Sequence, residues 1–542
     1  MSAARVLRWA ALLLALALLN LGLAHQNLWP TPWIRLSSDI SVELVMLVLA
    51  IAAAAAFGGR AGKRAQWIIA GILLLYALLR YIDVTAPALF GRRMDLYWDA
   101  RHIPAVAGMV LESWPVWEAV ALMAGLILGA ALLLLMFRWA TREICNASEE
   151  RGPRSCLIGV GVALLAAYAA GMTSGALQWE RWFAIPVTPV YAAQFASIGE
   201  RLLGATREGA QDEAALPAFA ALNGRDVFVI FLESYGRIAI DKPEFAGAVN
   251  EALAQLQTAA DETGWHARSA YFDAPTFGGN SWLSHASLLT GRVVRTHDSY
   301  EAFLHGKAEQ LADRFRTAGY RTVFMTPGIQ GAWPEGMLLR FDRVMTGMDI
   351  DYHGAEFGFW RVPDQVSLEH LYRQEIAPEE RKPLFAVFPT VMSHFPFGPT
   401  PPYLDDWSRL AAADPFDSEA VAASKALGDA VTGDKAAAYA RTMVYDLKLI
   451  AGFLANRAPK DSLVVVIGDH QPPAVISGEE QNWDVPVHVF ARDDAALTPF
   501  EEAGFAPGTR PEGGHLGGLE QVTGWMLQAL QAPGPTPVAG LD

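Results

Sequence analysis

Five apolar segments occupy the first third of the sequence, and each is about as long as a helix must be to cross a bilayer. They span residues 6–24, 40–57, 67–84, 116–140 and 157–172. In lipid, backbone polar groups are satisfied only within helices or closed barrels, so these segments cannot belong to an ordinary soluble domain. We predict an α-helical membrane domain of about five transmembrane helices over residues 1–176. Its first segment is interpreted as a retained helix rather than a cleaved signal peptide.

Basic residues near these segments predict their orientation, because lysine and arginine are enriched in cytoplasmic loops. Three sites carry them, namely Arg5 and Arg8 before the first segment, Arg60, Lys63 and Arg64 after the second, and Arg138, Arg142, Arg151 and Arg154 after the fourth. An odd number of spans then places everything after the last segment outside the cytoplasm. The two cysteines, Cys145 and Cys156, fall at the third basic site, so the exported part has no cysteine for a disulfide.

The rest of the sequence indicates a linker and one globular domain. Residues 177–223 combine aromatic side chains suited to the bilayer interface with a mixed polar stretch, which predicts interfacial linker helices. Residues 224–534 form the predicted extracytoplasmic domain, and residues 535–542 form a C-terminal tail. The formal net charge of −15 argues against a nucleic-acid partner, because phosphate binding requires concentrated lysine and arginine.

Apolar strands alternate with amphipathic helices in the globular domain. The predicted strands span residues 227–232, 321–325, 384–389, 463–467 and 485–490. The predicted helices span residues 245–262, 307–318, 367–376, 436–457 and 518–531. Such alternation predicts an α/β domain whose mainly parallel central sheet is covered by helices on both faces.

Candidate site residues follow the ends of three predicted strands, where open α/β sheets bind ligands. Asp469 and His470 follow the apolar run LVVVIG, and this adjacent carboxylate and imidazole can hold a divalent cation. The alternative is that Asp469 caps the next turn and His470 is merely exposed. Glu233 follows residues 227–232 as a second metal carboxylate, or else as a capping or ion-pairing acid. His394 follows residues 384–389 as a phosphate-binding or acid–base group, or else as an ordinary loop histidine.

Ser281 is the candidate nucleophile. It lies in TFGGNSWLSHASLLTGR (residues 276–292), where two glycines precede a predicted helix start. A hydroxyl at a helix N-terminus lies near backbone N–H groups, which favour a bound anion. Thr276 and Ser284 compete for this role, and the alternative is that Ser281 is only an N-cap.

The order of these motifs resembles a known family. Four motifs occur in a fixed order along the chain. They are Leu-Glu-Ser after the first strand, Gly-Gly-x-Ser-Trp leading to Leu-Thr-Gly, Ser-His-x-Pro-Phe, and a late Gly-Asp-His. Together they are similar to the membrane-anchored phosphoglycerol and phosphoethanolamine transferases of the alkaline phosphatase and sulfatase superfamily, of which lipoteichoic acid synthase is the best-known type. The resemblance covers the whole plan, from the N-terminal helices to the exported domain.

This resemblance implies roles for individual residues. Glu233, Asp469, His470 and Ser281 would bind one divalent metal ion, manganese or zinc, with magnesium as a third candidate. Ser281, which is threonine in many members, would also be the nucleophile. His394 and Trp333 would bind the phosphate-bearing head group. The family's arginine after that tryptophan is not matched, because Pro334 and Glu335 follow here, so the resemblance leaves the head group unspecified.

The implied reaction moves a phosphoglycerol or similar head group from a membrane phospholipid, through a covalent Ser281 intermediate, to a hydroxyl on a glycan or envelope polymer. The implied location is the bacterial inner membrane, with the catalytic domain periplasmic or extracellular. The alternatives are a phosphoethanolamine transferase, a phosphodiesterase or sulfatase-type hydrolase, and a non-catalytic membrane scaffold. A sulfatase is disfavoured because Leu283 and His285 stand where the Cys/Ser-x-Pro-x-Arg signature has Pro and Arg.

Overall fold

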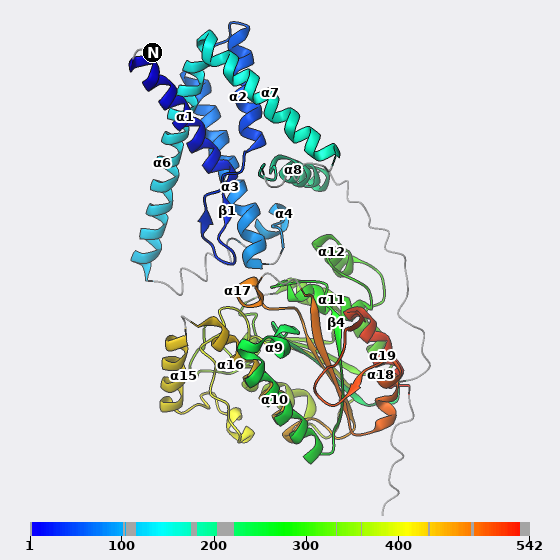
Figure 1. Cartoon of the computed structure of the whole chain (residues 1–542). Coiled ribbons are helices and arrows are strands. Elements are labelled where there is room, and N and C mark those ends of the chain that lie inside the picture. Colours follow the sequence, from blue (N-terminus) through cyan, green and yellow to red (C-terminus); the bar gives the residue numbers. More distant parts are fainter. Residues whose placement is uncertain are drawn as a thin grey trace, which may run out of the picture. The chain divides into compact units, whose positions relative to one another are not determined.

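The structure is a computed structural model that describes residues 3–90, 92–100, 103, 115–174, 182–202, 222–331, 333–358, 360–431, 434–478 and 482–531. The chain divides into two compact units, Met1–Thr206 and Arg207–Asp542 (Figure 1). The predicted linker over residues 177–223 lies partly outside the described residues, and the predicted tail over residues 535–542 lies wholly outside them.

Unit 1 contains the predicted apolar helices. They are α1 (Ala3–Ala24), α2 (Val42–Ala56), α3 (Lys63–Phe90), α6 (Val116–Glu149) and α7 (Arg151–Ser174). Within the described residues, α1, α3, α6 and α7 are long and apolar enough to cross a membrane, whereas α2 has only 15 residues. At 1.5 Å per residue α2 is about 22 Å long, shorter than the roughly 30 Å hydrocarbon core. The predicted helical membrane domain is therefore confirmed, with four full-length spans and one shorter apolar helix.

Two ion pairs bring the three basic sites to one end of this helical bundle. Arg8 pairs with Glu150 at 2.5 Å, and Arg60 pairs with Glu149 at 3.8 Å. The expected loop between the fourth and fifth segments is reduced to Glu150, because residues 141–149 contain no glycine or proline to end α6. Cys145 and Cys156 consequently lie on helices. One shared end is the arrangement that the predicted orientation requires.

The described part of the predicted linker contains α8 (Thr188–Leu202), which is joined to α2 by a carboxylate. Glu43 accepts hydrogen bonds from the backbone N–H groups of Val187 at 2.8 Å and Thr188 at 3.3 Å. A negative charge at a helix N-terminus is favourable because it meets unpaired N–H groups. This contact ties the first turn of α8 to the apolar helices.

The described residues of unit 2 form a nine-stranded sheet. Its strands are β3 (Asp226–Leu232), β4 (His266–Asp273), β5 (Arg321–Thr326), β6 (Arg343–Thr346), β7 (Leu384–Pro389), β8 (Ser462–Gly468), β9 (Asp484–Ala491), β10 (Ala506–Pro507) and β11 (His515–Gly518). Their order is β10-β4-β9-β8-β3-β7-β5-β6, with β11 paired to β4. Strand β3 runs parallel to both β7 and β8 at the centre of the sheet.

Helices cover both faces of the sheet, as predicted (Figure 1). The longer ones are α10 (Pro243–Glu262), α11 (Ser281–Thr290), α12 (His297–His305), α13 (Leu311–Thr317), α14 (Asp364–Leu371), α15 (Ser418–Val431), α16 (Lys435–Asn456) and α19 (Val522–Ala529). Short helices are α4 (Leu96–Asp99) in unit 1 and α9 (Ile238–Asp241), α17 (Ala474–Ser477) and α18 (Thr498–Glu502) in unit 2.

Strand β3 is buried on both faces, and its side chains alternate between two apolar clusters. Phe228 and Ile230 pack with residues of α10 and α16 in the first cluster. Val229 and Phe231 pack with residues of α11, α13 and α19 in the second. Alternating side chains point to opposite faces of a strand, so a fully apolar run such as VFVIFL is a central strand covered on both sides. This burial fixes the position in the sheet at which β3 ends and Glu233 follows it.

Candidate functional site

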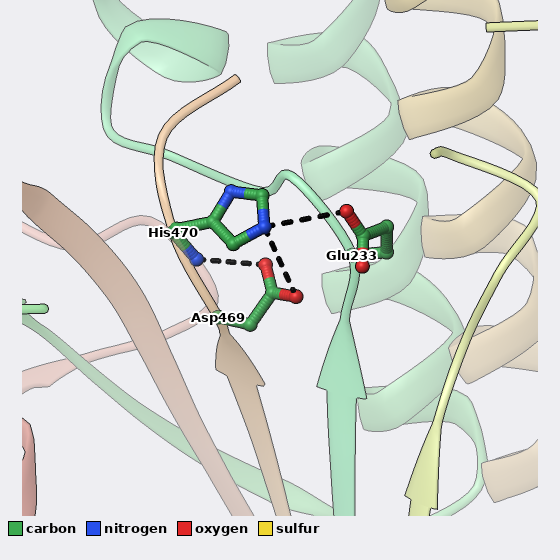
Figure 2. Close-up of side chains that lie close together, drawn as sticks. All are labelled: Glu233, Asp469 and His470. Atoms are coloured by element: carbon green, nitrogen blue, oxygen red, sulfur yellow. Dashed lines mark hydrogen bonds and ion pairs between the residues drawn. The ribbon is translucent and has the colours of Figure 1, made fainter. Parts of the chain in front are cut away.

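The ends of β3 and β8 bring two acidic residues together. The two strands are parallel neighbours, and their register pairs Leu232 with Gly468, so Glu233 and Asp469 leave the sheet at the same edge. A Cβ on Gly468 would lie 1.9 Å from the backbone oxygen of Tyr235, so only glycine permits this close approach. Single ligand atoms of Glu233, Asp469 and His470 lie within 4.8 Å of one another (Figure 2).

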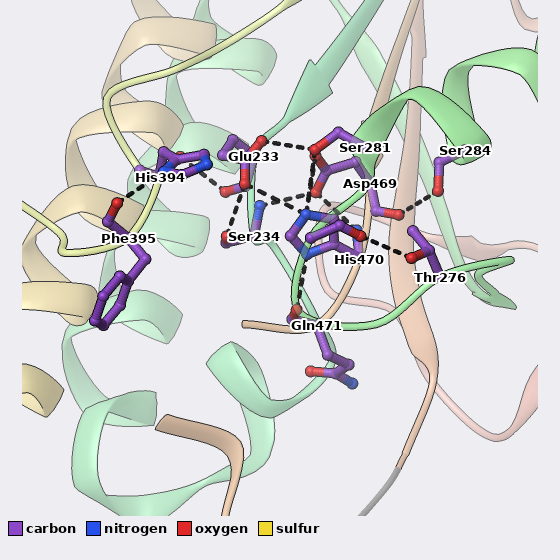
Figure 3. Close-up of polar contacts among 12 residues, drawn as sticks. Glu233, Ser234, Thr276, Ser281, Ser284, His394, Phe395, Asp469, His470 and Gln471 are labelled. Carbon is purple, nitrogen blue, oxygen red and sulfur yellow. Dashed lines mark hydrogen bonds and ion pairs between the residues drawn. The ribbon is translucent and has the colours of Figure 1, made fainter. Parts of the chain in front are cut away.

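Ser281 joins this cluster from α11. Its Oγ donates a hydrogen bond to Glu233 Oε2 at 2.9 Å and lies 3.2 Å from His470 Nε2. His470 Nε2 in turn lies 3.3 Å from Glu233 Oε1 and 3.6 Å from Asp469 Oδ2. The structure therefore brings together the four residues proposed as metal ligands, from three separate parts of the chain (Figure 3).

Neighbouring backbone groups orient the ligand atoms. The ring nitrogen Nδ1 of His470 lies 2.8 Å from the carbonyl oxygen of Gln471, so Nδ1 donates a hydrogen there and Nε2 is the ring nitrogen that faces the cluster. Asp469 Oδ1 accepts the backbone N–H groups of Ser234 at 2.8 Å and His470 at 2.7 Å, which leaves Oδ2 for the cluster. Such outer contacts fix the orientation of metal ligands.

Two residues with left-handed backbone flank the site. Ser234, at φ 59°, directly follows Glu233, and its hydroxyl donates to Glu233 Oε1 at 3.0 Å. Asn280, at φ 62°, directly precedes Ser281. A positive φ is unfavourable for residues with a side chain and is found often at functional sites. Both turns aim a functional side chain into the same space.

The cluster is buried, with Glu233 8% exposed and Asp469 and His470 each 1% exposed. Burial alone would raise the pKa of Glu233, but His470 and His394 hold this pKa well below its usual range. Burial and the Glu233 charge raise the pKa of Asp469 to about 8. Burial alone would lower the pKa of His470, but Asp469 and Glu233 raise it to about 9. Two buried carboxylates thus create a site that attracts positive charge.

The donor set fits a divalent cation. It combines two carboxylates, one imidazole nitrogen that faces inward and becomes a ligand when its proton is lost, and one hydroxyl oxygen. Divalent metals bind such mixtures of nitrogen and oxygen atoms, and they compensate the cost of burying two negative charges.

The competing hydroxyls have other partners. Thr276 Oγ1 donates to the carbonyl of Gly279 at 2.7 Å, and Ser284 Oγ donates to the carbonyl of Asp469. Both side chains are buried, and their hydroxyls are used in hydrogen bonds to backbone carbonyls around the cluster. Of the three hydroxyl candidates, the structure places Ser281 against the carboxylate and imidazole (Figure 3).

His394 and Trp333 differ in their placement. His394 is exposed in the loop after β7, and it is close enough to Glu233 to lower the pKa of that carboxyl. Trp333 packs against Phe324, with ring centroids 6.0 Å apart, and over Gly336. Among the described contacts, none joins Trp333 to His394 or Ser281.

Sequence reasoning missed four supporting residues, Ser234, Asp364, Ser393 and Asp446. Ser393 Oγ lies within hydrogen-bond distance of the Glu233 carbonyl, at 2.8 Å, and of Asp446 Oδ2. Ser234 and Ser393 adjoin Glu233 and His394 in the sequence, so this adjacency could have identified them. Asp364 and Asp446 lie on helices α14 and α16, and their burial becomes evident only from the fold.

The family model for sulfatases matches residues 225–489, which contain the four clustered residues and His394. No curated protein matches the chain.

Several solved structures resemble parts of the chain. A protein of the alkaline phosphatase superfamily from Vibrio parahaemolyticus is 19% identical over 51% of this chain and 62% of that one, with a TM-score of 0.30. The integral membrane lipooligosaccharide phosphoethanolamine transferase A of Neisseria meningitidis is 11% identical over 90% of this chain and 89% of that one, with a TM-score of 0.48. The phosphoglycerol transferase GacH of Streptococcus pyogenes is 13% identical over 62% and 81%, with a TM-score of 0.34.

The family match begins one residue before β3 and ends within β9, so it spans the central strands and the whole cluster at their carboxyl ends. The similarity to the sulfatase family model therefore lies on the globular domain of this chain and includes all four clustered residues.

Proposed function

We propose that this chain is a metal-dependent transferase that moves a phosphoglycerol, or similar phospho-alcohol, from a membrane phospholipid to an acceptor hydroxyl on a glycan or envelope polymer. The observation that carries the proposal is the Ser281 hydroxyl, 2.9 Å from Glu233 and 3.2 Å from His470 at the start of α11. A hydroxyl held within a cluster of metal-ligand type is the arrangement that an activated nucleophile requires.

Glu233, Asp469, His470 and Ser281 are the proposed ligands of one divalent ion, manganese or zinc. When bound, the ion would supply positive charge that lowers the pKa of the Ser281 hydroxyl and offsets negative charge developing on the phosphate oxygens. Asp469 and His470 follow β8 directly, and their orientation is fixed by the backbone contacts of Ser234 and Gln471.

In the first step, Ser281 Oγ attacks the phosphorus of the phospholipid diester. A bond forms between Oγ and phosphorus, and the bond from phosphorus to the diacylglycerol oxygen breaks in line with it. The proton lost by Ser281 ends on the diacylglycerol oxygen, so that diacylglycerol leaves as a neutral alcohol. In the second step the acceptor hydroxyl attacks the same phosphorus, and its proton returns to Ser281 as the Oγ–phosphorus bond breaks.

The membrane helices support a lipid donor. Four described helices have the length and composition of membrane spans, so the chain would be held at the surface where its donor is concentrated. We place the protein in a bacterial inner membrane, with unit 2 on the periplasmic or outer side. The shared end of the three basic sites supports this orientation.

The proposal is tested with full-length protein in detergent, supplied with Mn²⁺ or Zn²⁺ and labelled phosphatidylglycerol or phosphatidylethanolamine. Diacylglycerol release that is lost in Ser281→Ala supports the proposal, and Thr290→Ala, at the far end of α11, is the matched control. Transfer of the label to an added glycan identifies a transferase. Release of the label as free glycerol phosphate or phosphoethanolamine identifies a hydrolase, and no turnover of either lipid contradicts the proposal.

A further inference from the structure

Trp360 contacts the histidine beside the metal-ligand cluster. Its ring meets the His394 ring edge to face, with centroids 5.2 Å apart and an interplanar angle of 76°. The Trp360 ring is seated in a narrow space, because a Cβ on Gly328 would lie 3.1 Å from both Trp360 and Val391. The tryptophan therefore has a fixed position from which to restrain the imidazole.

The segment that carries Trp360 also holds the backbone of the His394 loop. Asp364, four residues after Trp360, accepts the backbone N–H groups of Val391 at 2.9 Å and Met392 at 2.8 Å. Asp364 is fully buried, so water does not compete for these bonds. One segment thus contacts the loop twice, once at its backbone and once at the His394 ring.

These contacts leave one nitrogen of His394 available. Nδ1 lies 2.7 Å from the carbonyl oxygen of Phe395, so Nδ1 carries a hydrogen and donates it there. Among the described residues, no hydrogen bond is formed by Nε2, and the His394 side chain is exposed. The restrained ring therefore leaves Nε2 for a ligand, and Figure 3 shows the ring beside Glu233.

Trp333 lies among different neighbours. It packs against the apolar cluster on the face of the sheet that contains Val229 and Phe231. Trp360 packs against the opposite cluster, which also contains Val391 and Met392 from the His394 loop. Of these two tryptophans, only Trp360 shares its surroundings with His394.

We propose that Trp360 is a positioning residue for the head-group site, which it serves by holding the His394 imidazole with Nε2 toward a small, phosphate-bearing alcohol. The inference rests on the proposed function, because it assigns a specificity residue to that same site. It predicts that the two side chains act as one unit. Removing Trp360 frees the imidazole to rotate. The imidazole then loses more conformational entropy when it forms a hydrogen bond to the ligand, so binding is weaker.

The test measures binding of glycerol phosphate to Zn²⁺-loaded, full-length protein in detergent by titration calorimetry. Trp360→Leu and His394→Gln are each expected to weaken binding about five- to tenfold. The double variant should bind within about twofold of His394→Gln alone, because coupled residues are not additive. Trp360→Phe retains an aromatic partner and should recover binding to within about threefold of the wild type.

The matched control is Trp525→Leu, which removes another half-buried tryptophan from unit 2. Trp525 packs on Phe272 and Phe505, with ring centroids 5.6 and 6.0 Å apart, so its loss tests general loosening of the domain. It should leave glycerol phosphate affinity within about twofold of the wild type. Thermal unfolding of every variant identifies any variant that does not fold. If Trp360→Leu does not fold, Trp360→Phe replaces it in the comparison with His394→Gln.

Four outcomes overturn the inference, namely wild-type affinity in Trp360→Leu, additive effects in the double variant, a loss in Trp333→Leu instead, and no glycerol phosphate binding by the wild type. Failure of the proposed function is a separate result, because it is read from diacylglycerol release. Coupled binding losses without lipid turnover would support the role of Trp360 while contradicting the transferase. Lipid turnover by the wild type, together with wild-type glycerol phosphate affinity in Trp360→Leu, would support the transferase while contradicting the role of Trp360.

Discussion

The hydroxyl oxygen of Ser281 lies 2.9 Å from the carboxylate of Glu233, although 48 positions separate the two residues in the sequence. Glu233 is placed by the end of a buried central strand, and Ser281 is the first residue of a helix that follows a left-handed Asn280. Neither residue could reach the other without the parallel sheet, so this contact links the fold to the proposed chemistry.

Replacement of Ser281 separates a nucleophile from a capping residue. Ser281→Ala should lower kcat/KM for lipid turnover by about 10³-fold or more, because the covalent route is lost. Ser281→Thr retains the hydroxyl and should recover activity to within about tenfold of the wild type. Steady-state kinetics on both variants checks this, and an alanine variant with near-wild-type kcat/KM would exclude the nucleophilic role.

Metal binding should release protons. In the metal-free site the pKa values of Asp469 and His470 are raised to about 8 and about 9, so both groups hold protons at pH 7. A bound cation requires them deprotonated, so metal affinity should rise with pH by about tenfold per unit for each displaced proton and level off above pH 9. Calorimetric titration of Zn²⁺ in buffers of different ionisation enthalpy counts these protons. A flat affinity between pH 6 and pH 9 would contradict this arrangement.

Asp446 should act as a hydrogen-bond donor behind the cluster. Burial and the nearby Asp364 charge raise its pKa well above its usual range, which favours a protonated carboxyl that would donate to Ser393 and leave the Ser393 hydroxyl to donate to the Glu233 carbonyl. Asp446→Asn keeps a hydrogen-bond donor to Ser393 and should retain most of the activity. Asp446→Leu removes that donor and should lower kcat/KM about tenfold. Kinetics and metal affinity of the two variants provide the check. Equal losses in both would show that the donor is not what matters.

His488 should make unit 2 sensitive to acid. It is fully buried between Tyr235 and Ser269, with hydrogen-bond distances of 3.1 and 2.8 Å, and burial lowers its pKa to about 3. The unfolded chain protonates this histidine near pH 6.5, so stability is lost as pH falls from 6.5 toward 3, by about 2 kcal/mol at pH 5. His488→Gln should be less stable at pH 7, but it lacks the loss of stability that protonation of His488 causes in acid. Unfolding midpoints across pH should therefore converge at low pH, and parallel curves would contradict the assignment.

Much of the fold could be predicted because its signals are local. The run LVVVIG before Asp469 and the run VFVIFL before Glu233 are apolar without interruption, and each forms a central strand within one residue of the predicted bounds. Strand β4 was missed because HARSAYFD mixes polar and apolar residues on an outer part of the sheet. Strand β9 runs antiparallel to β8, a direction that its apolar pattern does not encode.

The site could be predicted only where chemistry follows directly from a strand end. Glu233, Asp469, His470 and Ser281 each follow a strand or begin a helix, and the sheet brings them to one edge. Trp360 and Asp446 carry no such signal, because their relation to His394 and Ser393 depends on how distant segments pack. Conversely, Trp333 was chosen by resemblance, which says nothing of the face of the sheet on which its ring packs.

The central claim is that Ser281 carries the head group during transfer. Full-length protein with Mn²⁺ can be mixed with labelled phosphatidylglycerol in the absence of acceptor, quenched in acid and digested, and the peptide containing Ser281 analysed by mass spectrometry. The account predicts a glycerol phosphate group joined to Ser281, absent from Ser281→Ala and removed when an acceptor glycan is added. Turnover of the lipid with Ser281 unmodified at every time point, or with the group on another residue, would contradict it.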